Sequence, residues 1–386
     1  MAYVRSDKGK KYLEKNVYEM AKERIKHTIN ITDEQIIGFS GGKDSLVLMN
    51  IVKEVYKELG INEKPKVFFL DEEIIPNAVE DFVKEIYNSQ EYEFYWYAIP
   101  LESKKYILGK NYEYIQWDND REWFREPPDF AIMDKSLKGL SEYNLDKYIC
   151  KDLKGKVAIY RGIRTDESFY RFMTIYNNKS KYPWISKSKH SKRIINSQPI
   201  YDWTFDDIFL YFYKNRIHYC KTYDYQMWNQ EPLRVATPML AENKWKFSKF
   251  KSYDESFYDR IIEIFPEMRL NEKYLKDYKK SVDLSDYGAN VKDVIRFIDD
   301  NIKDEAENNL AKKRIKQALK LRYASIGKHD KWFGGFPYYR LYKRILGGEY
   351  KKSLVPLKIY YRPDFFFEGY TEEDYQEYKK TRTNKW

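Results

Sequence analysis

The stretch from Ile36 to Ser45, IIGFSGGKDS, restricts the fold of this chain more than any other part of the sequence. Apolar residues up to Phe39 are followed by a Ser-Gly-Gly turn, and apolar residues then recur at helical spacing from Leu46 to Val55. This pattern predicts a buried strand, a tight loop and a helix. The backbone N–H groups of such a loop point into one concavity at the positive end of the helix, where phosphate binds well.

The loop therefore predicts a phosphate site, to which one lysine and two hydroxyl groups are added. Its residues are Ser40, Gly41, Gly42, Lys43, Asp44 and Ser45. The glycines stand directly before the lysine, so the stretch cannot be read as a Walker A loop.

Segments with strand character alternate with helical segments along the first part of the chain. Apolar runs at 66–71, 94–100 and 157–160 predict further buried strands, and Pro76 opens a helix that we expect over 77–87. Such alternation predicts an α/β fold with a doubly wound parallel sheet, which binds ligands at the carboxyl ends of its strands. Asp71 would stand at the end of the second strand.

The alternation stops over residues 101–152, a segment rich in aromatic and charged residues. Two interpretations stay open for this insertion: it lies over the nucleotide site, or it is a packed excursion on the surface. The composition changes again near residue 266. We therefore expect a nucleotide-binding domain over 1–265 and a smaller, mainly helical, basic and aromatic-rich domain over 266–386.

Composition excludes several classes of protein. The chain has 386 residues, of which 42% are hydrophobic and 34% charged, as expected of a globular protein. It has no apolar run near the roughly 20 residues that a membrane span requires. The first residues are polar and lack a signal-peptide core, so we expect a cytoplasmic protein. Two cysteines and four scattered histidines predict neither a disulfide framework nor an iron–sulfur cluster.

The formal charge of +10 is concentrated near the end of the chain. Residues 312–352 hold thirteen lysines or arginines against two acids, with aromatic residues among them. Nucleic acid would fit this pattern, since bases stack on aromatic faces, and so would an acidic partner protein. The alternative is that the aromatic residues form the core of this domain and the lysines its solvated face. A second basic run covers 179–193.

The loop motif, SGGKDS at 40–45, resembles the pyrophosphate-binding (PP) loop of the adenine nucleotide alpha-hydrolase superfamily. This superfamily has a Rossmann-like fold and includes ATP pyrophosphatases and phosphoadenosine phosphosulfate (PAPS) reductases. A second motif, Gly-x-Arg-x-x-Glu-Ser-x-x-Arg at 162–171, is similar to a PAPS reductase signature. The segments 198–208 and 233–236 also fit that family, the latter as a late basic contact.

The resemblance implies a set of site residues. Lys43, Asp44, Arg164 and Arg171 would be catalytic. Nucleotide binding would fall to the loop residues 40–45 together with Asp71, Gly162, Arg164, Glu167 and Ser168. A guanidinium forks onto phosphate or sulfate, and a spacing of seven places Arg171 on the same helical face as Arg164. Asp71 and Glu72 are candidate magnesium ligands beside a triphosphate.

The sequence departs from the PAPS reductases at two points. No cysteine follows residue 220, so the thiol that reduces PAPS in the assimilatory enzymes is missing. Asp71 is followed by Glu72 and Glu73, which would repel a 3′-phosphate. The Cys-poor C-terminal extension looks most like a branch that includes a co-regulator of immunoglobulin-binding proteins, which has a ParB/sulfiredoxin-like partner.

Three hypotheses follow for function. The first is an enzyme that cleaves ATP between the α- and β-phosphates and activates a substrate as its adenylate. The second is a sulfonucleotide enzyme of sulfur metabolism that acts on PAPS with a thiol from another protein. The third is a regulatory protein that binds an adenine nucleotide without turnover and acts on nucleic acid. The acceptor substrate is not specified by the sequence.

Overall fold

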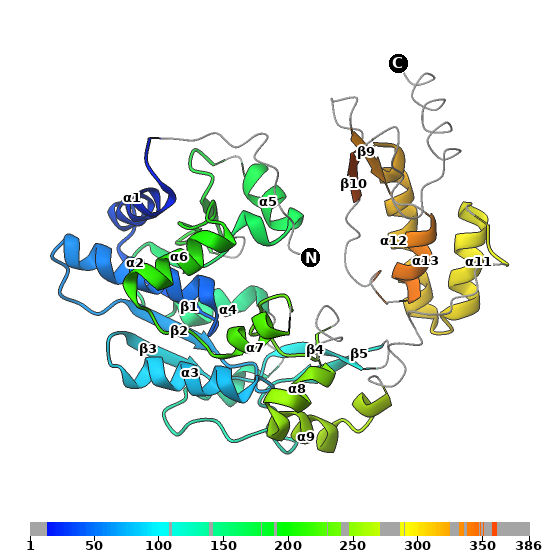
Figure 1. Cartoon of the computed structure of the whole chain (residues 1–386), viewed down its shortest axis with the longest axis horizontal. Coiled ribbons are helices and arrows are strands. Elements are labelled where there is room, and N and C mark those ends of the chain that lie inside the picture. The colour runs from blue at the N-terminus through cyan, green and yellow to red at the C-terminus, as the bar shows by residue number, and fades with distance from the viewer. Residues whose placement is uncertain are drawn as a thin grey trace. The chain divides into compact units, whose positions relative to one another are not determined.

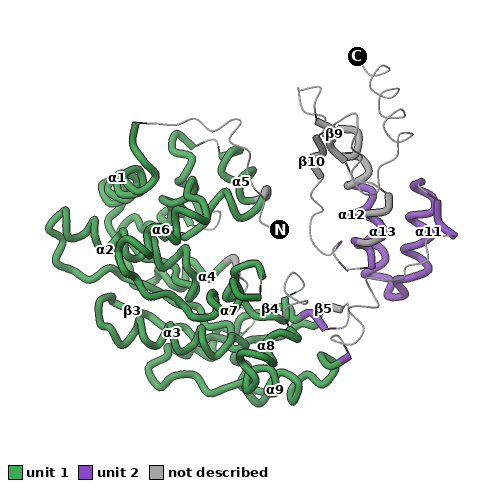
Figure 2. Tube along the Cα trace, viewed as in Figure 1, with its two compact units in different colours: residues 1–105, 112–269 green, residues 106–111, 270–386 purple. Residues whose placement is uncertain are grey.

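The computed structural model describes most of the chain up to residue 270 and parts of the remainder. The described residues are 14–107, 110–138, 142–178, 180–188, 191–229, 231–240, 247–270, 286–288, 290–324, 332–335, 338–346, 348, 350 and 357–360. The chain divides into two compact units, one of residues 1–105 and 112–269 and the other of residues 106–111 and 270–386 (Figure 2). The sequence placed a domain boundary at 265/266.

A mostly parallel sheet forms the centre of the first unit (Figure 1). Its strand order is β3-β2-β1-β6-β8-β7, and the edge strand β7 runs antiparallel to β8. The strands are β1 (Glu34–Phe39), β2 (Lys66–Leu70), β3 (Glu93–Tyr97), β6 (Val157–Arg161), β7 (Ile185–Lys187) and β8 (Ile194–Ser197). The predicted α/β fold with a parallel sheet is therefore confirmed.

Both faces of this sheet are buried, because alternate residues of each strand point to opposite sides. Phe39 of β1 and Phe69 of β2 pack on one side, where helices α1, α2, α3 and α6 cover the sheet. Ile36 and Phe68 pack on the other side, against α4. The helices are α1 (Val17–Asn30), α2 (Lys43–Glu58), α3 (Asn77–Asn88), α4 (Glu142–Ile149) and α6 (Phe205–Asn215).

The strand order fixes where a ligand can bind. From β1 the chain runs outward through β2 to β3, and it then returns to place β6 on the other side of β1. The connections that leave β1 and β6 therefore diverge at the carboxyl edge of the sheet. Ligands of open α/β sheets bind at such a switch point. The loop at 40–45 follows β1, and the motif at 162–171 follows β6.

The remaining helices of the first unit follow the sheet strands or pack beside them. They are α5 (Phe169–Tyr176), α7 (Thr222–Trp228), α8 (Phe247–Tyr253) and α9 (Glu255–Ile264). The insertion at 101–152 contains the antiparallel pair β4 (Glu102–Ile107) and β5 (Lys110–Ile115), as well as α4. The sequence pattern predicts no helix or strand in this segment. The insertion also joins the core directly, because Ala98 donates its N–H to Ile132 at 3.0 Å.

The second unit has a small helical core of its own. Its elements are α11 (Val291–Asn301), α12 (Glu305–Ala324), β9 (Trp332–Gly335), α13 (Tyr338–Leu346) and β10 (Leu357–Tyr360). Phe297, Ile298, Tyr342 and Tyr350 are buried in this core. Strand β9 pairs antiparallel with β10, and α13 begins at Tyr338.

Candidate nucleotide-binding site

The loop between β1 and α2 has the geometry that its glycines predict. Gly41 lies at φ +71°, where a side chain is strained, and a Cβ there would stand 2.8 Å from Val79 of α3. Gly42 caps α2 in an extended conformation without a side-chain hydrogen bond. The amino end of α2 is therefore open to an anion at the carboxyl edge of the sheet.

Hydroxyl groups of the loop itself and of a distant tyrosine form hydrogen bonds within and to this loop. Ser45 donates to the carbonyl of Gly42 at 3.0 Å, and the hydroxyls of Ser40 and Ser45 lie 3.2 Å apart. The buried Tyr223, at the start of α7, accepts the backbone N–H of Lys43 at 2.9 Å. The loop is thus held in one conformation before any ligand arrives.

Asp44 joins the two predicted motifs. Its carboxylate accepts Lys43 Nζ at 2.8 Å on one oxygen and Arg164 Nε at 2.6 Å on the other. Lys43 and Arg164 are only 5% and 3% exposed. Burial lowers the pKa of Lys43, and Asp44 opposes this effect. The two buried cations therefore share Asp44 at the amino end of α2, and Arg164 Nη1 also lies 3.3 Å from Asp166 Oδ2.

Two further arginines belong to the same cluster. Burial lowers the pKa of Arg171. The nearby charges of Arg234 and Arg164 lower this pKa further, whereas the carboxylate of Asp44 raises it. Arg171 also forms an ion pair with Glu167. Arg234 is positioned by the buried Gln226, which accepts its N–H at 2.7 Å and donates to its carbonyl at 2.6 Å.

The expectation that Arg164 and Arg171 share a helical face is wrong. Arg164 precedes a short 3₁₀ turn, Thr165–Glu167, whereas Arg171 lies in α5, which begins at Phe169. The change of direction between turn and helix, rather than a helical repeat, brings both guanidinium groups near Asp44. Sequence spacing alone cannot specify such a bend.

Three residues of the second motif support the backbone around the cluster. A Cβ at Gly162 would lie 2.7 Å from the backbone nitrogen of Ser45, so the strand end of β6 approaches the loop closely. Ser168 caps α5 by accepting the N–H of Arg171 at 3.2 Å. Glu167 accepts the N–H of Arg164 at 3.4 Å. These contacts position the two arginines.

The segment 199–204 forms a hydrogen bond with Arg164 and is itself held by Arg24. The buried Arg24 of α1 donates to both carboxylate oxygens of Asp202 at 2.6 Å and to the carbonyl of Pro199 at 2.8 Å. The carbonyl of Trp203 in turn accepts Arg164 Nη1 at 3.3 Å. Helix α6 follows this segment, with Thr204 as its N-cap and a capping box to Asp207.

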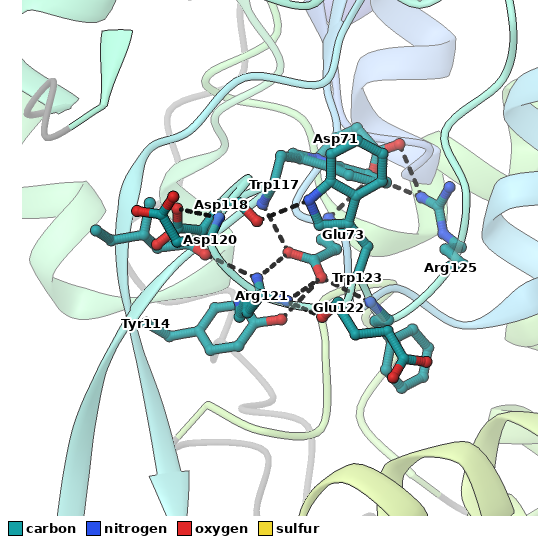
Figure 3. Close-up of polar contacts among 12 residues, drawn as sticks. Asp71, Glu73, Tyr114, Trp117, Asp118, Asp120, Arg121, Glu122, Trp123 and Arg125 are labelled. Carbon is teal, nitrogen blue, oxygen red and sulfur yellow. Dashed lines mark hydrogen bonds and ion pairs between the residues drawn. The ribbon is translucent and has the colours of Figure 1, made fainter. Parts of the chain in front are cut away.

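The end of β2 differs from what the sequence predicts. Asp71 is fully buried, and its carboxylate accepts Trp96 Nε1 at 2.8 Å. The same carboxylate accepts Arg125 Nη2 at 2.6 and 2.7 Å (Figure 3). Burial raises the pKa of Asp71, and Arg125 counteracts this shift. The carboxylate therefore faces an arginine and a tryptophan inside the protein.

Glu73 is also fully buried and holds the insertion in place (Figure 3). It accepts the side chain of Arg121 on both oxygens, the hydroxyl of Tyr114 at 2.9 Å and the N–H groups of Trp117 and Phe124 at 2.7 and 2.8 Å. A glutamate that repels an incoming phosphate was expected here. The structure instead uses this charge to bind its own chain.

The proposed magnesium ligands do not fit a metal site. The bound guanidinium of Arg125 occupies both oxygens of Asp71, which leaves no open position for a hard cation. Within the described ranges, no three His, Cys, Asp or Glu side chains gather closely enough to hold a metal ion. A magnesium ion would have to arrive with the phosphates of a nucleotide.

The two cysteines are structural. Cys150 and Cys220 are buried in the hydrophobic clusters on opposite faces of the sheet. Burial raises the pKa of Cys150 to about 12 and also raises that of Cys220. Neither is a thiolate at neutral pH, so neither has the reactivity of a nucleophile. The absence of an iron–sulfur cluster stays a prediction.

The sequence analysis missed three positioning residues, namely Tyr223, Gln226 and Arg24. Tyr223 and Lys43 are 180 residues apart, and Arg24 and Asp202 are 178 apart, whereas Gln226 binds Arg234 eight residues further along the chain. No local pattern in the sequence links Arg24 to Asp202 or Tyr223 to Lys43, because these contacts depend on the fold.

Taken together, the parallel sheet, the open amino end of α2 and the cations around Asp44 define an α/β protein with a phosphate-binding PP-loop. The family model of the phosphoadenosine phosphosulfate reductase domain matches residues 34–327. The chain belongs to this family and has its adenine nucleotide-binding PP-loop fold.

Individual relatives match the chain over only part of its length. The uncharacterized protein YbdN of Escherichia coli (strain K12) is 32% identical over 214 residues, which are 51% of this chain and 52% of that protein. This chain spans about half the length of the curated relatives it matches.

Solved structures resemble the chain in part. Candida glabrata FMN adenylyltransferase in complex with FAD and inorganic pyrophosphate is 15% identical, with a TM-score of 0.37 over 54% of this chain and 60% of that one. The PAPS reductase of Candida auris, in a phosphate complex, is 14% identical, with a TM-score of 0.32 over 56% and 93%. No described helix is both long and apolar enough to span a membrane.

Proposed function

We propose that the protein binds ATP and cleaves it between the α- and β-phosphates, so that a substrate is activated as its adenylate. One observation carries this proposal: Lys43 and Arg164 bind Asp44 at the amino end of α2, and Arg171 and Arg234 add positive charge beside them. The carboxylates paired with these cations are Asp44, Asp166 and Glu167, so four positive charges stand against three negative ones and a further anion is favoured. A polyphosphate supplies several negative charges in the volume that these groups surround.

The chemistry follows from this placement. A nucleophilic oxygen of the acceptor attacks the α-phosphorus, and the bond to the bridging oxygen breaks with its electron pair on the departing pyrophosphate. The leaving group gains negative charge as this bond breaks. Lys43 and the backbone N–H groups at 40–45 are placed to bind that charge, and Arg164 and Arg171 approach it from the β6 side. Charge stabilisation of this kind supplies most of the catalysis in such sites.

The state of the cysteines supports ATP cleavage over PAPS reduction by this chain alone. Reduction of PAPS needs a thiolate, and burial keeps Cys150 and Cys220 protonated. A sulfonucleotide reaction would therefore require a thiol from a partner protein.

A nucleic acid partner has weaker support. Two of the aromatic residues in the basic segment 312–352, Tyr342 and Tyr350, are buried in the core of the second unit and cannot stack on bases. Most of the other aromatic side chains of this segment lie outside the described residues. In the second basic run, Arg193 donates to the carbonyls of Leu153 and Gly155, which is a structural role. Binding would appear as a linear fall of log affinity with log salt. The absence of a gel shift at low salt and micromolar protein would exclude binding to nucleic acid.

The direct test is pyrophosphate release. The purified protein is first examined by mass spectrometry for co-purified nucleotides, and ATP turnover is then measured with candidate acceptors, beside the Lys43→Ala variant as a control. Release of pyrophosphate and AMP that depends on Lys43 supports the proposal. If the protein releases sulfite from PAPS in the presence of an added thiol and does not cleave ATP, the sulfonucleotide reaction is favoured over ATP cleavage. ATP binding without turnover under any condition would favour a regulatory role.

A further inference from the structure

The guanidinium of Arg125 has an unused hydrogen-bond donor. This residue comes from the insertion, and its side chain is 13% exposed. Nη2 donates to both oxygens of Asp71, and Nε lies 3.1 Å from Glu80 Oε2. Nη1 is buried and has no hydrogen-bond acceptor in the structure as far as it is described. A buried donor without an acceptor is costly, so its presence calls for an explanation.

Arg125 lies beside the phosphate loop. Phe69 of β2 is paired with Phe39 of β1, so Asp71 and Gly41 leave the sheet next to each other at its carboxyl edge. Val79 of α3 packs against Gly41, and Glu80 is the next residue of that helix. Asp71, one partner of Arg125, therefore leaves the sheet next to the loop that holds the phosphates in the proposed function, and Glu80, the other partner, follows the helix residue that packs against this loop.

The surrounding segment is held in a fixed conformation. Glu73 and Trp117 lie at φ +64° and +52°, which is unusual for bulky residues, and they are joined by a hydrogen bond of 2.7 Å. Trp117 Nε1 donates to the carbonyl of Asp71 at 2.7 Å, and its ring lies 5.2 Å from the Arg125 guanidinium. Strained backbone persists where the surroundings determine it, and such positions cluster at ligand sites.

We propose that Arg125 is a nucleotide-binding residue whose Nη1 donates to a neutral acceptor in the adenosine half of the nucleotide. This inference rests on the proposed function and names its substrate class: nucleotides without a 3′-phosphate. Asp71 and Glu80 flank the guanidinium of Arg125, Lys84 pairs with Glu80 at 2.7 Å, and Glu73 matches the charge of Arg121. Because these charges already balance, Nη1 can donate to a ring nitrogen or a ribose hydroxyl, but no net positive charge remains to compensate a buried phosphate dianion.

The first experiment compares two ligands that differ only in the 3′-phosphate. Calorimetric titrations of the full chain with AMP and with adenosine 3′,5′-bisphosphate measure the preference directly. We expect AMP to bind at least about tenfold more tightly, as one repulsive or unsatisfied contact would produce. Equal affinities, or tighter binding of the bisphosphate, would overturn the exclusion of 3′-phosphates.

The second experiment changes Arg125. Arg125→Lys keeps a charge beside Asp71 but removes the planar fork, and the double variant Arg125→Gln/Asp71→Asn avoids leaving a buried carboxylate unpaired. We expect either variant to bind AMP and ATP about tenfold more weakly, with thermal unfolding used to confirm that it is folded. Arg260→Gln is the matched control, because Arg260 holds the same segment from outside through the carbonyls of Trp123 and Phe124. We expect this control to bind as the parent does.

The outcomes separate the inference from the proposed function. If Lys43→Ala weakens ATP binding while the folded Arg125 variants bind as the parent does, the assignment of Arg125 is wrong and the phosphate site stands. If the parent binds no adenine nucleotide at all, the proposed function fails and this inference fails with it. Equal losses in the Arg125 variants and in Arg260→Gln would show that Arg125 only supports the fold, which also overturns the assignment.

Discussion

The close approach of Gly162 to the phosphate loop gives the sharpest test of how the two motifs are joined. We predict that Gly162→Ala destabilises the protein and weakens nucleotide binding at once. The added Cβ would lie 2.7 Å from the Ser45 nitrogen, 2.9 Å from the Asp44 carbonyl carbon and 3.0 Å from the Ser45 Cα. All three are backbone atoms of α2, which cannot rotate away as the end of a side chain can.

The magnitude follows from the overlap. Ordinary contact begins near 3.4 Å, so β6 and α2 must separate by about 0.7 Å. Overpacking of this kind costs about 1–3 kcal/mol in the free energy of unfolding. The shift also pulls Arg164, two residues further along, away from Asp44, to which Nε now donates at 2.6 Å. We expect the dissociation constant for ATP to rise about tenfold, because charged hydrogen bonds contribute roughly 1.5–3 kcal/mol.

The assays are urea denaturation and ATP titration by calorimetry. Gly38→Ala is the control: its Cβ would meet the ring edge of Phe68 at 3.1 Å, and this side chain can move. We expect that variant to lose about 1 kcal/mol or less and to bind ATP normally. If Gly162→Ala unfolds at the same urea concentration and binds ATP as the parent does, the packing argument is refuted.

Four further predictions concern the cluster and the thiols. Lys43→Ala should weaken ATP binding by about 1.5–3 kcal/mol in calorimetry, the range for a charged hydrogen bond, and unchanged affinity would exclude the phosphate site. Burial lowers the pKa of Lys43 below its usual 10.5, so at alkaline pH the unfolded chain keeps the proton of Lys43 more often than the folded chain does. The free energy of unfolding, measured by denaturation relative to Lys43→Met, should therefore rise as the pH approaches 10.5. A difference between the two proteins that does not change with pH would contradict this. Replacing Arg164 or Arg171 by Lys should lower turnover, since an ammonium cannot reproduce the fork; two fully active variants would make the motif structural. Cys150→Ala/Cys220→Ala should retain nucleotide binding and ATP cleavage, and loss of turnover in the folded double variant would implicate a thiol.

Some features of the protein are determined by local sequence. The strand, loop and helix over 34–58 were predicted from apolar periodicity and two glycines, because each element depends on residues a few positions apart. Gly60, at φ +68°, follows α2 in the left-handed conformation that glycine adopts readily. The α/β class followed from the order of such elements along the chain.

Local patterns failed where the chain bends or where tertiary contacts override them. Arg164 and Arg171 reach Asp44 across a turn, so the helical spacing assumed for them was wrong. For Tyr342 and Tyr350 the sequence left open both stacking on bases and packing in the core of their own domain, and they lie in the core of the second unit. A sequence does not show whether an aromatic residue faces solvent or its own core.

The tertiary structure alone decided which charges neutralise one another. Asp44 pairs with Arg164 over 120 residues, and Asp71, expected to bind a nucleotide and magnesium, pairs with Arg125 of the insertion over 54. Composition predicted repulsion from Glu72 and Glu73, but the structure surrounds Glu73 with five donors. The physical reason is that the energy of a charge depends on its distance to other charges and on its burial, and only the folded chain sets these two quantities.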